Sequence, residues 1–448
     1  MPTDFDRFIA TTRHEADLFD PGRPLVAARG PGWVDLIGGA AADGGALALG
    51  WPLGGGAFVA AQPVPEHVIR LATVRHDHQQ LALHELELDD GWPREYADVA
   101  VRLADQPELV RLAGAVWLAL AREEFVRPRS GVSLFVRPSD SPGGQVGLAA
   151  ALAQALVTTF DVHLSPRELA LAVQVALREL GPADPGVLGP LVSVCAHGAA
   201  LLQVHQQPAW LWGSLHLPPG AALWSVRIGH GPDPHQALPL RVASAMAYQL
   251  AVAASGLPPA DAHARWLGYL SNLGTAAYEA RIRAALPEQF NGADFLAQHG
   301  SLPGLPIDPA VPYPVRAAAA LAIEEHLRAR MIAALLRAAA SKAQRDEDLH
   351  LVGELMARSH GGQRAAGLSD PQADALVAQI YTEGAEHGLY GARAAAASSG
   401  ATLVVLGRTD AELALRELVA NYGRTHQLAT SVHGSSSSGA SAAGTREG

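Results

Sequence analysis

The chain has 448 residues, of which 49% are hydrophobic and 17% are charged. A chain of this length usually forms about two or three domains, and this composition excludes wholesale disorder. Acidic side chains outnumber basic ones by 44 to 33, which gives a net charge of −11 and argues against a nucleic-acid or anionic-membrane partner.

Cysteine usage and hydropathy favour a cytoplasmic protein. The single cysteine, Cys195, excludes an intrachain disulfide, and we expect it to be a small buried apolar residue rather than a nucleophile. The first residues carry acids early and do not resemble a signal peptide. No stretch approaches the roughly 18 apolar residues of a membrane helix.

The N-terminal part of the chain is expected to be rich in strands. Short apolar runs bounded by Gly, Pro and Asp predict strands, and apolar residues at helical spacing predict helices. A short helix up to about residue 19 is followed by predicted strands at 23–30, 56–62, 68–74, 80–86 and 131–137, and by predicted helices at 109–125 and 167–180.

The C-terminal part is expected to be rich in helices. The pattern predicts strands at 223–228 and 402–406, and helices at 235–255, 260–285, 313–339, 346–359, 371–386 and 410–422. We therefore expect an α+β protein of two lobes. The expected divisions are an N-terminal extension at 1–20, domains at 21–215 and 216–433, and a low-complexity, disordered tail at 434–448.

A Gly-rich turn feeds directly into an Ala- and Leu-rich helix at residues 138–160, PSDSPGGQVGLAAALAQALVTTF. Amides at a helix N-terminus favour anions, so this segment is a candidate phosphate cradle. The candidate anion-binding residues are Gly143, Gly144, Val146 and Gly147. No hydroxyl stands at 147–150, which read Gly, Leu, Ala and Ala. The alternative is a plain turn before a buried helix.

Several segments resemble, in order, motifs of one kinase family. They are GPGWVDLIGGAAADGGALAL, the Gly-rich turn, PGVLGPLVSVCAHG, YLSNLGTAAYEARIRAALPEQFNGADFL, SHGGQRAAGLSD and GLYGARAAAASSGATLVVLGR. Together they resemble the galactokinase and L-arabinokinase branch of the GHMP small-molecule kinases. The resemblance implies the two-domain GHMP kinase fold with the ligand cleft between the domains. It also implies transfer of the γ-phosphoryl group of ATP, with Mg²⁺, to a sugar hydroxyl.

The chemical positions of these motifs depart from the family pattern. The family's catalytic aspartate matches Gly189, which has no side chain to accept a proton. Asp184 on the same loop is a weak substitute, because small misplacements of a catalytic group already cost much of the rate. The family's serines match Gly147, Leu148 and Ala149, so the resemblance implies no magnesium ligand there.

The first motif offers three candidate substrate-binding residues. Trp33 stands at the family's arginine position, where it would either stack on a sugar or fill the vacated space. Asp35 and Asp43 are candidates for hydrogen bonds to a polyol, and capping of the turn is the alternative for both. No His or Cys cluster has the spacing of a metal site.

The leading hypothesis is a sugar-kinase-like protein that has lost or strongly impaired phosphoryl transfer. Its expected partners are a sugar or sugar-phosphate ligand or a protein partner. The alternative is an active ATP-dependent sugar kinase with relocated catalytic groups, and only this alternative requires ATP and Mg²⁺ as cofactors.

Overall fold

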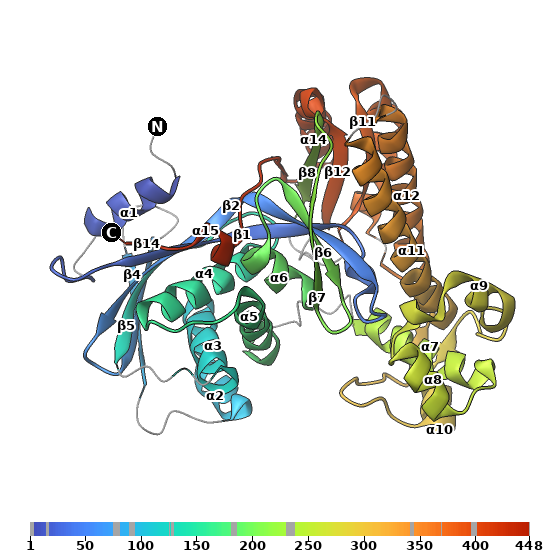
Figure 1. The fold of residues 1–448 in the computed structure, drawn as a ribbon, viewed down its shortest axis with the longest axis horizontal. Coiled ribbons are helices and arrows are strands. Elements are labelled where there is room, and N and C mark those ends of the chain that lie inside the picture. The colour runs from blue at the N-terminus through green and yellow to red at the C-terminus, as the bar shows by residue number, and fades with distance from the viewer. Residues whose placement is uncertain are drawn as a thin grey trace. The chain divides into compact units, whose positions relative to one another are not determined.

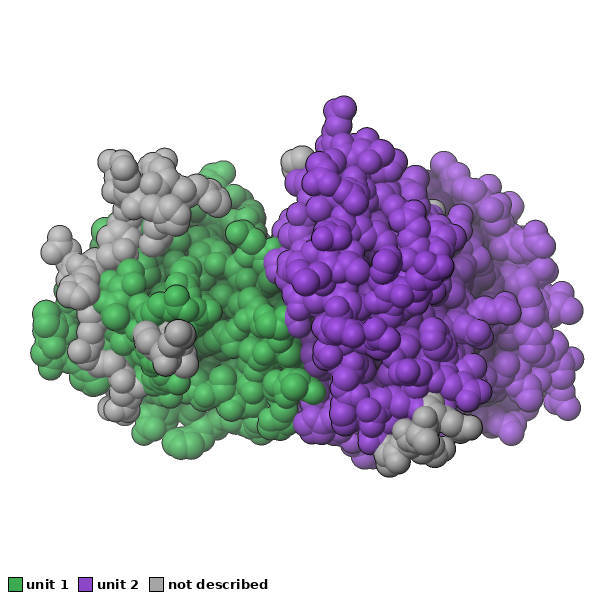
Figure 2. Space-filling model, turned by 90° about the horizontal axis from the view of Figure 1, so that it is seen from above, with its two compact units in different colours: residues 1–33, 52–199, 435–448 green, residues 34–51, 200–434 purple. Residues whose placement is uncertain are grey.

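A computed structural model describes most of the chain in two compact units, which Figure 2 colours separately. Unit 1 contains residues 1–33, 52–199 and 435–448, and unit 2 contains residues 34–51 and 200–434. The described residues are 4–14, 18–74, 81–88, 95–124, 126, 130–180, 186–229, 238–340, 345–368, 370–395 and 401–447. The units are therefore discontinuous in sequence, whereas the sequence analysis expected one division at residue 215.

Unit 1 contains a sheet with the strand order β14-β1-β2-β5-β3-β4. β3 runs parallel to β5, and β5 runs antiparallel to β2. The strands are β1 (Val26–Ile37) and β2 (Leu47–Val64), which both continue into unit 2, and β3 (Val68–Val74), β4 (Leu81–Glu87), β5 (Gly131–Arg137) and β14 (Arg446–Glu447). Six of the seven residues of β5 are buried.

The helices of unit 1 cover this sheet. Phe5 and Phe8 of α1 pack against Phe58 and Phe135 of the sheet. In Figure 1, α3, α4 and α5 gather below the sheet and α1 lies above it. The helices are α1 (Asp4–His14), α2 (Tyr96–Leu103), α3 (Glu108–Glu123), α4 (Gly144–Thr159), α5 (Pro166–Leu180), α6 (Leu188–Cys195) and α15 (Ala440–Ala443).

Residues 435–447 are folded against unit 1. Val26 and Ala27 of β1 pair with Glu447 and Arg446 of β14. The prediction of a disordered tail is wrong for these residues. Although the sequence is of low complexity, its serines and its backbone find hydrogen-bond partners on β2 and near α6.

Unit 2 contains a smaller sheet with the order β11-β12-β8-β13 and a hairpin whose first strand, β6, pairs with Leu47–Gly50 of β2. Its strands are β6 (Ala200–His205), β7 (Trp210–His216), β8 (Ala221–Ile228), β9 (Phe290–Asn291), β10 (Pro312–Tyr313), β11 (Leu389–Ala394), β12 (Ala401–Arg408) and β13 (Thr430–His433). The buried strand β12 lies at the predicted position, because its apolar run is continuous.

Long helices fill the rest of unit 2. The long helices α11 and α12 lie side by side, and α12 packs on β11 (Figure 1). The α-helices are α7 (Leu238–Ser255), α8 (Pro259–Trp266), α9 (Thr275–Ala277), α10 (Gly292–His299), α11 (Val315–Ala339), α12 (Arg345–Ala365), α13 (Pro371–Glu383) and α14 (Glu412–His426). Short helical turns lie at Gly39–Ala41, Leu270–Leu273, Tyr278–Ile282, Ala385–His387 and Thr409–Ala411. Among the described residues, no helix has the length and apolarity needed to span a membrane.

The helix predicted at 260–285 is broken in the structure. α8 ends at Trp266, and Leu267 and Gly268 follow in the left-handed region with φ of 53° and 86°. Gly274 has a φ of 72° as well. Positive φ ends a right-handed helix, and glycine adopts it without steric cost. The sequence analysis gave more weight to the helical periodicity of this segment than to Gly268 and Gly274, which indicate breaks in the helix.

Candidate functional site

The Gly-rich turn joins β5 to α4 in unit 1. Gly143 is the N-cap of α4 and has a φ of 67°, a conformation that favours glycine. The amide of Gly144 donates to the carbonyl of Ser141 at 2.9 Å, and the amide of Gly147 donates to the carbonyl of Gly143 at 3.1 Å. Two of the four predicted anion-binding residues therefore already use their amides within the turn and the helix.

The turn does contain hydroxyls, which the sequence analysis overlooked. Ser139 Oγ lies 2.7 Å from Ser141 Oγ, and Ser141 Oγ donates to the carbonyl of Gly55 at 3.2 Å. Both hydroxyls precede the glycines, whereas the sequence analysis examined only the start of the helix. They hold the turn against β2.

The indole of Trp33 fills the space beside this turn. Trp33 has no solvent exposure, and its amide donates to the carbonyl of Pro142 at 2.9 Å. A β-carbon placed on Gly143 would lie 2.4 Å from Trp33 Cδ1, and one placed on Gly189 would lie 2.5 Å from Trp33 Cε2. Contacts this short do not occur between real side chains, so the ring occupies the volume that a side chain at 189 would need.

This packing decides between the two roles predicted for Trp33. A fully buried ring has no face open for stacking on a sugar, so Trp33 is a filling residue in this structure. Its Nε1 has no hydrogen-bond partner among the described residues. Asp184, the substitute for the missing carboxylate, lies outside the described residues.

Asp35 lies in the interior of unit 2, in an ion pair that the sequence analysis did not predict. Its Oδ2 lies 2.8 Å from an Nη of Arg393, and neither side chain is exposed. The amide of Gly39 also donates to Oδ2, at 3.0 Å. Arg393 lies on β11, in the apolar run GLYGARA. Asp35 and Arg393 are residues of opposite charge within apolar strands, and this pattern could have predicted that they form a buried ion pair.

Glu325 of α11 extends this buried network. Its Oε1 accepts from Ser359 Oγ at 2.7 Å and lies 3.8 Å from Arg393, and its Oε2 accepts from Arg328 Nε at 3.0 Å. Removing one member of such a network leaves an uncompensated buried charge, which is strongly destabilising. Oδ2 of Asp35 is thus held by structural partners, whereas its buried Oδ1 has no hydrogen-bond partner among the described residues.

His360 borders the same network. Ala394 N donates to its Nδ1 at 3.4 Å, and its Nε2 lies 3.1 Å from Asp374 Oδ1. Burial lowers the pKa of His360, although the nearby Asp374 carboxylate opposes that shift. The acceptor role of Nδ1 and the lowered pKa both fit a neutral ring.

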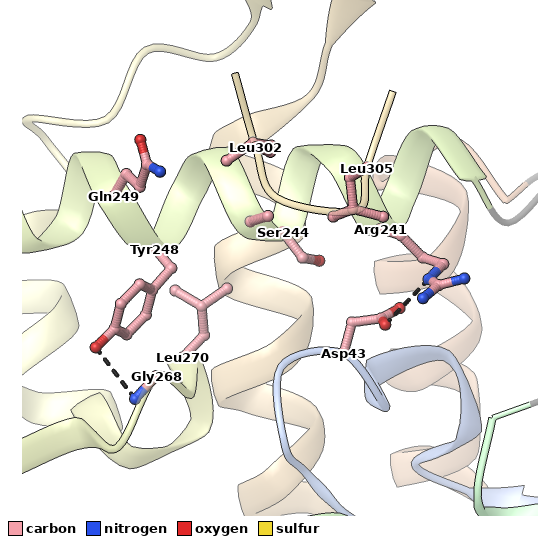
Figure 3. A pocket seen from close by; sticks show the side chains of 10 residues that line it. Asp43, Arg241, Ser244, Tyr248, Gln249, Gly268, Leu270, Leu302 and Leu305 are labelled. Atoms are coloured by element: carbon pink, nitrogen blue, oxygen red, sulfur yellow. Dashed lines mark hydrogen bonds and ion pairs between the residues drawn. The ribbon is translucent and has the colours of Figure 1, made fainter. Parts of the chain in front are cut away.

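Asp43 lies at the edge of a cavity of about 270 Å³ in unit 2 (Figure 3). Its Oδ1 lies 3.2 Å from Arg241 Nε of α7, and both side chains are partly exposed. Asp43, one of the three predicted substrate-binding residues, lines this cavity together with Arg241. Trp33 belongs to unit 1, and Asp35 and Asp43 belong to unit 2.

Cys195 is partly exposed at the end of α6, which differs from the expected full burial. Its Sγ donates to the carbonyl of Pro166 at 3.4 Å. Burial of the thiol raises its pKa to about 12. Because the thiolate is the reactive form, this pKa disfavours a nucleophilic role.

At the positions that the resemblance assigns to metal and phosphate ligands, the described residues carry no side-chain oxygen. Mg²⁺ prefers carboxylate, hydroxyl and water oxygens. The positions that would supply them are Gly147, Ala149 and Gly189, and the indole of Trp33 lies against the last of these. Among the described residues, no group of three or more His, Cys, Asp or Glu side chains is arranged to hold a metal ion.

Three comparisons show what the chain is similar to. Residues 331–424 match the GHMP kinases C terminal family. L-arabinokinase of Arabidopsis thaliana is 26% identical over an alignment of 457 residues, gaps included, and the alignment covers 87% of this chain. The structure of Lactococcus lactis galactokinase complexed with galactose matches with a TM-score of 0.71 and 15% identity, over 97% of this chain and 99% of that one. Together, these similarities support the GHMP kinase superfamily and, within it, the galactokinase and L-arabinokinase branch.

This chain spans less than half of L-arabinokinase, 43% of that protein's length. A mevalonate kinase structure shares the fold more distantly, with a TM-score of 0.53 and 12% identity over 92% of this chain and 99% of that one. The resemblance and the α+β GHMP kinase fold expected from the sequence are therefore confirmed.

Proposed function

We propose that this GHMP-superfamily chain binds a sugar or sugar phosphate and has lost efficient phosphoryl transfer. The observation that carries the proposal is the position of Trp33. Its indole lies within 2.5 Å of the place where a β-carbon at position 189 would stand. A catalytic carboxylate at 189 and the buried ring exclude each other.

The missing groups account for a large loss of rate. A positioned general base usually contributes about 10²–10⁴-fold. Phosphoryl transfer also relies on a metal ion and on donors that neutralise the developing charge. With glycine at 189 and no hydroxyl at 147–149, both contributions are lost at the matching positions.

The ligand class is proposed from the relatives. Their names are L-arabinokinase and galactokinase, and the latter was solved with galactose. A scaffold of this branch that lacks the transfer groups still offers carboxylates, hydroxyls and apolar walls, which is the chemistry that recognises a neutral polyol.

The test combines a sensitive ATP-turnover assay with thermal-shift titrations of Mg·ATP, ADP and a panel of monosaccharides and sugar phosphates. We expect a shift with at least one sugar and turnover far below the 1–100 s⁻¹ that is typical of kinases. Turnover in that range would overturn the proposal and favour the active kinase with relocated groups.

A matched variant identifies the source of any turnover. Asp184→Asn removes the nearest alternative carboxylate on the loop before Gly189. Activity that is abolished by Asp184→Asn would assign the relocated base to Asp184. Trace activity that is unchanged by it would point to a contaminant.

A further inference from the structure

Two arginines lie together on the face of the unit 1 sheet that α1 covers. Arg29 of β1 and Arg137 of β5 both contact the ring of Phe58 on β2, with their Cζ atoms 5.6 Å and 4.3 Å from its centre. The Cζ atom of Arg137 also lies 5.3 Å from the centre of the Phe8 ring of α1. In Figure 1, α1 lies above the sheet and α4 lies below it. The arginine pair is therefore on the opposite face of the sheet from α4.

The guanidinium groups of this pair have unused donors. A guanidinium carries five N–H groups in a rigid fork. The rings of Phe8 and Phe58 hold Arg137 by cation–π contacts, and among the described residues its guanidinium makes no hydrogen bond and no ion pair. Arg29 donates from one Nη to the carbonyl of Gly54, which is a neutral acceptor. Because both arginines are partly exposed, a ligand can reach the pair from solvent.

The two positive charges have no ion-pair partner among the described residues. Burial lowers the pKa of both Arg29 and Arg137, and the nearby Asp4 carboxylate opposes this shift in each. However, Oδ1 of Asp4 already lies 2.6 Å from an Nη of Arg7. Since arginine stays protonated at neutral pH, two partly desolvated cations remain side by side in a chain whose net charge is −11.

The charge and shape of this pair favour a tetrahedral dianion. Guanidinium forks form paired hydrogen bonds with the oxygens of carboxylates and phosphates. A single carboxylate would neutralise only one of the two arginines. A phosphate group carries about −1.5 to −2 charges at pH 7 and offers three acceptor oxygens, so it matches both cations at once.

We propose that Arg29 and Arg137 form a binding site for one phosphate group, either as inorganic phosphate or as a phosphate monoester, beside α1. The bound group bridges β1 and β5 through the two guanidinium forks, while Phe8 and Phe58 keep Arg137 in place. The site goes beyond the proposed function, because neither arginine is a candidate for sugar binding or for phosphoryl transfer.

The test is calorimetric titration of inorganic phosphate and of phenyl phosphate, at constant ionic strength, into the wild-type chain and four variants. Arg29→Gln and Arg137→Gln should each weaken binding at least about tenfold, because charge-assisted hydrogen bonds are about twice as strong as neutral ones. Arg137→Lys keeps the charge but loses the planar fork, and it should weaken binding about threefold to tenfold. Arg178→Gln removes the same charge from an exposed position of α5 and should leave the affinity unchanged.

The outcomes support the site or overturn it. Phosphate binding that is weakened by the changes at Arg29 and Arg137, but not by Arg178→Gln, supports it, and the probe that binds more tightly shows whether the free ion or the ester is preferred. Equal binding in all five proteins overturns it, as does no binding of either probe at millimolar concentration. A lower unfolding midpoint of Arg137→Gln without phosphate binding to the wild-type chain would show that this arginine only fastens α1.

Failure of this inference is distinct from failure of the proposed function. Neither probe carries a sugar or a nucleotide, so a negative result leaves the proposed sugar binding and the loss of phosphoryl transfer untouched. Those two claims are decided by the sugar titrations and by ATP turnover.

Discussion

In unit 1, the indole of Trp33 occupies the space that a side chain at position 189 would need, so each position restricts the size of the residue at the other. The ring has no exposure, and α6 approaches it so closely that even a methyl group at 189 would collide with it. Sequence reasoning found both positions as departures from a motif. The structure shows that these two departures compensate each other sterically, because it brings Gly189 of α6 against Trp33 of β1.

This compensation predicts non-additive stabilities. Gly189→Ala should destabilise the wild-type chain by about 1–3 kcal/mol through overpacking. In a Trp33→Ala background, which itself should cost about 3–5 kcal/mol, the same change should be neutral or stabilising by up to about 1 kcal/mol, because alanine favours helix. Urea unfolding of the four proteins measures the coupling.

Gly361→Ala is the control for this cycle. Gly361 lies in α12, and a β-carbon there meets nothing within 4 Å. Gly361→Ala should therefore stabilise the wild-type chain and the Trp33→Ala chain equally. Equal effects of Gly189→Ala in the two backgrounds would contradict the shared volume.

His326 of α11 makes stability depend on pH. Burial, and then the neighbouring His205 and Arg330, lower its pKa to about 4. Its Nδ1 accepts from the amide of Leu47 at 3.1 Å, which requires that nitrogen to be unprotonated. Because the folded pKa lies below the unfolded value of about 6.5, the stabilisation is complete above pH 6.5 and is lost as the pH falls toward 4.

His326→Asn should reduce this loss, because an amide oxygen can accept from Leu47 without titrating. Urea midpoints at pH 7.5 and pH 5 should differ less in the variant than in the wild-type chain. His387→Asn replaces an exposed histidine and should leave the wild-type pH dependence in place. A variant with the full wild-type dependence would exclude His326 as a source.

At the scale of elements, the C-terminal segment is the largest departure from expectation. Ser436 Oγ and Ser437 Oγ donate to the carbonyls of Pro52 and Leu53 at 2.8 Å and 2.9 Å. The amide of Gly439 donates to the carbonyl of Ala196 at 2.8 Å. Serine and glycine, which suggest disorder in a sequence, here supply the small side chains that let the segment lie against β2 and α6.

Deleting residues 435–448 should therefore lower the free energy of unfolding by about 2–5 kcal/mol, since each lost hydrogen bond contributes about 0.5–1.5 kcal/mol. The double change Ser436→Ala and Ser437→Ala should cost about 1–3 kcal/mol on the same basis. Ser431→Ala, an exposed serine in β13, serves as the control. An unchanged unfolding midpoint in the truncated chain would show that the segment contributes nothing.

At the scale of the whole molecule, each unit is completed by distant segments. Residues 34–51 belong to unit 2, where they supply Asp35 to Arg393 and the pairing partner of β6. A cut near residue 215, as the sequence suggested, would separate these partners.

A fragment of residues 200–434 should consequently fail to unfold cooperatively in urea, because Arg393 is left buried without its carboxylate and β6 loses Leu47–Gly50. Joining residues 34–51 to its N-terminus through a flexible linker should restore a cooperative transition. Cooperative unfolding of the unlinked fragment, with an m-value appropriate to its size, would contradict the interleaved arrangement.

The sequence by itself determined the elements and the ancestry of this protein. Apolar periodicity predicted β3, β5 and β12 close to their observed bounds. The order of the motifs indicated a resemblance to the GHMP kinases, because local pattern and motif order do not depend on tertiary contacts. It also located the altered chemical positions, among them Gly189. Only the structure showed the surroundings of these positions. The indole of Trp33 lies against Gly189, Arg393 pairs with Asp35, and Asp43 lines a cavity. These contacts join residues far apart in the chain, and only the packed fold sets the distances between them.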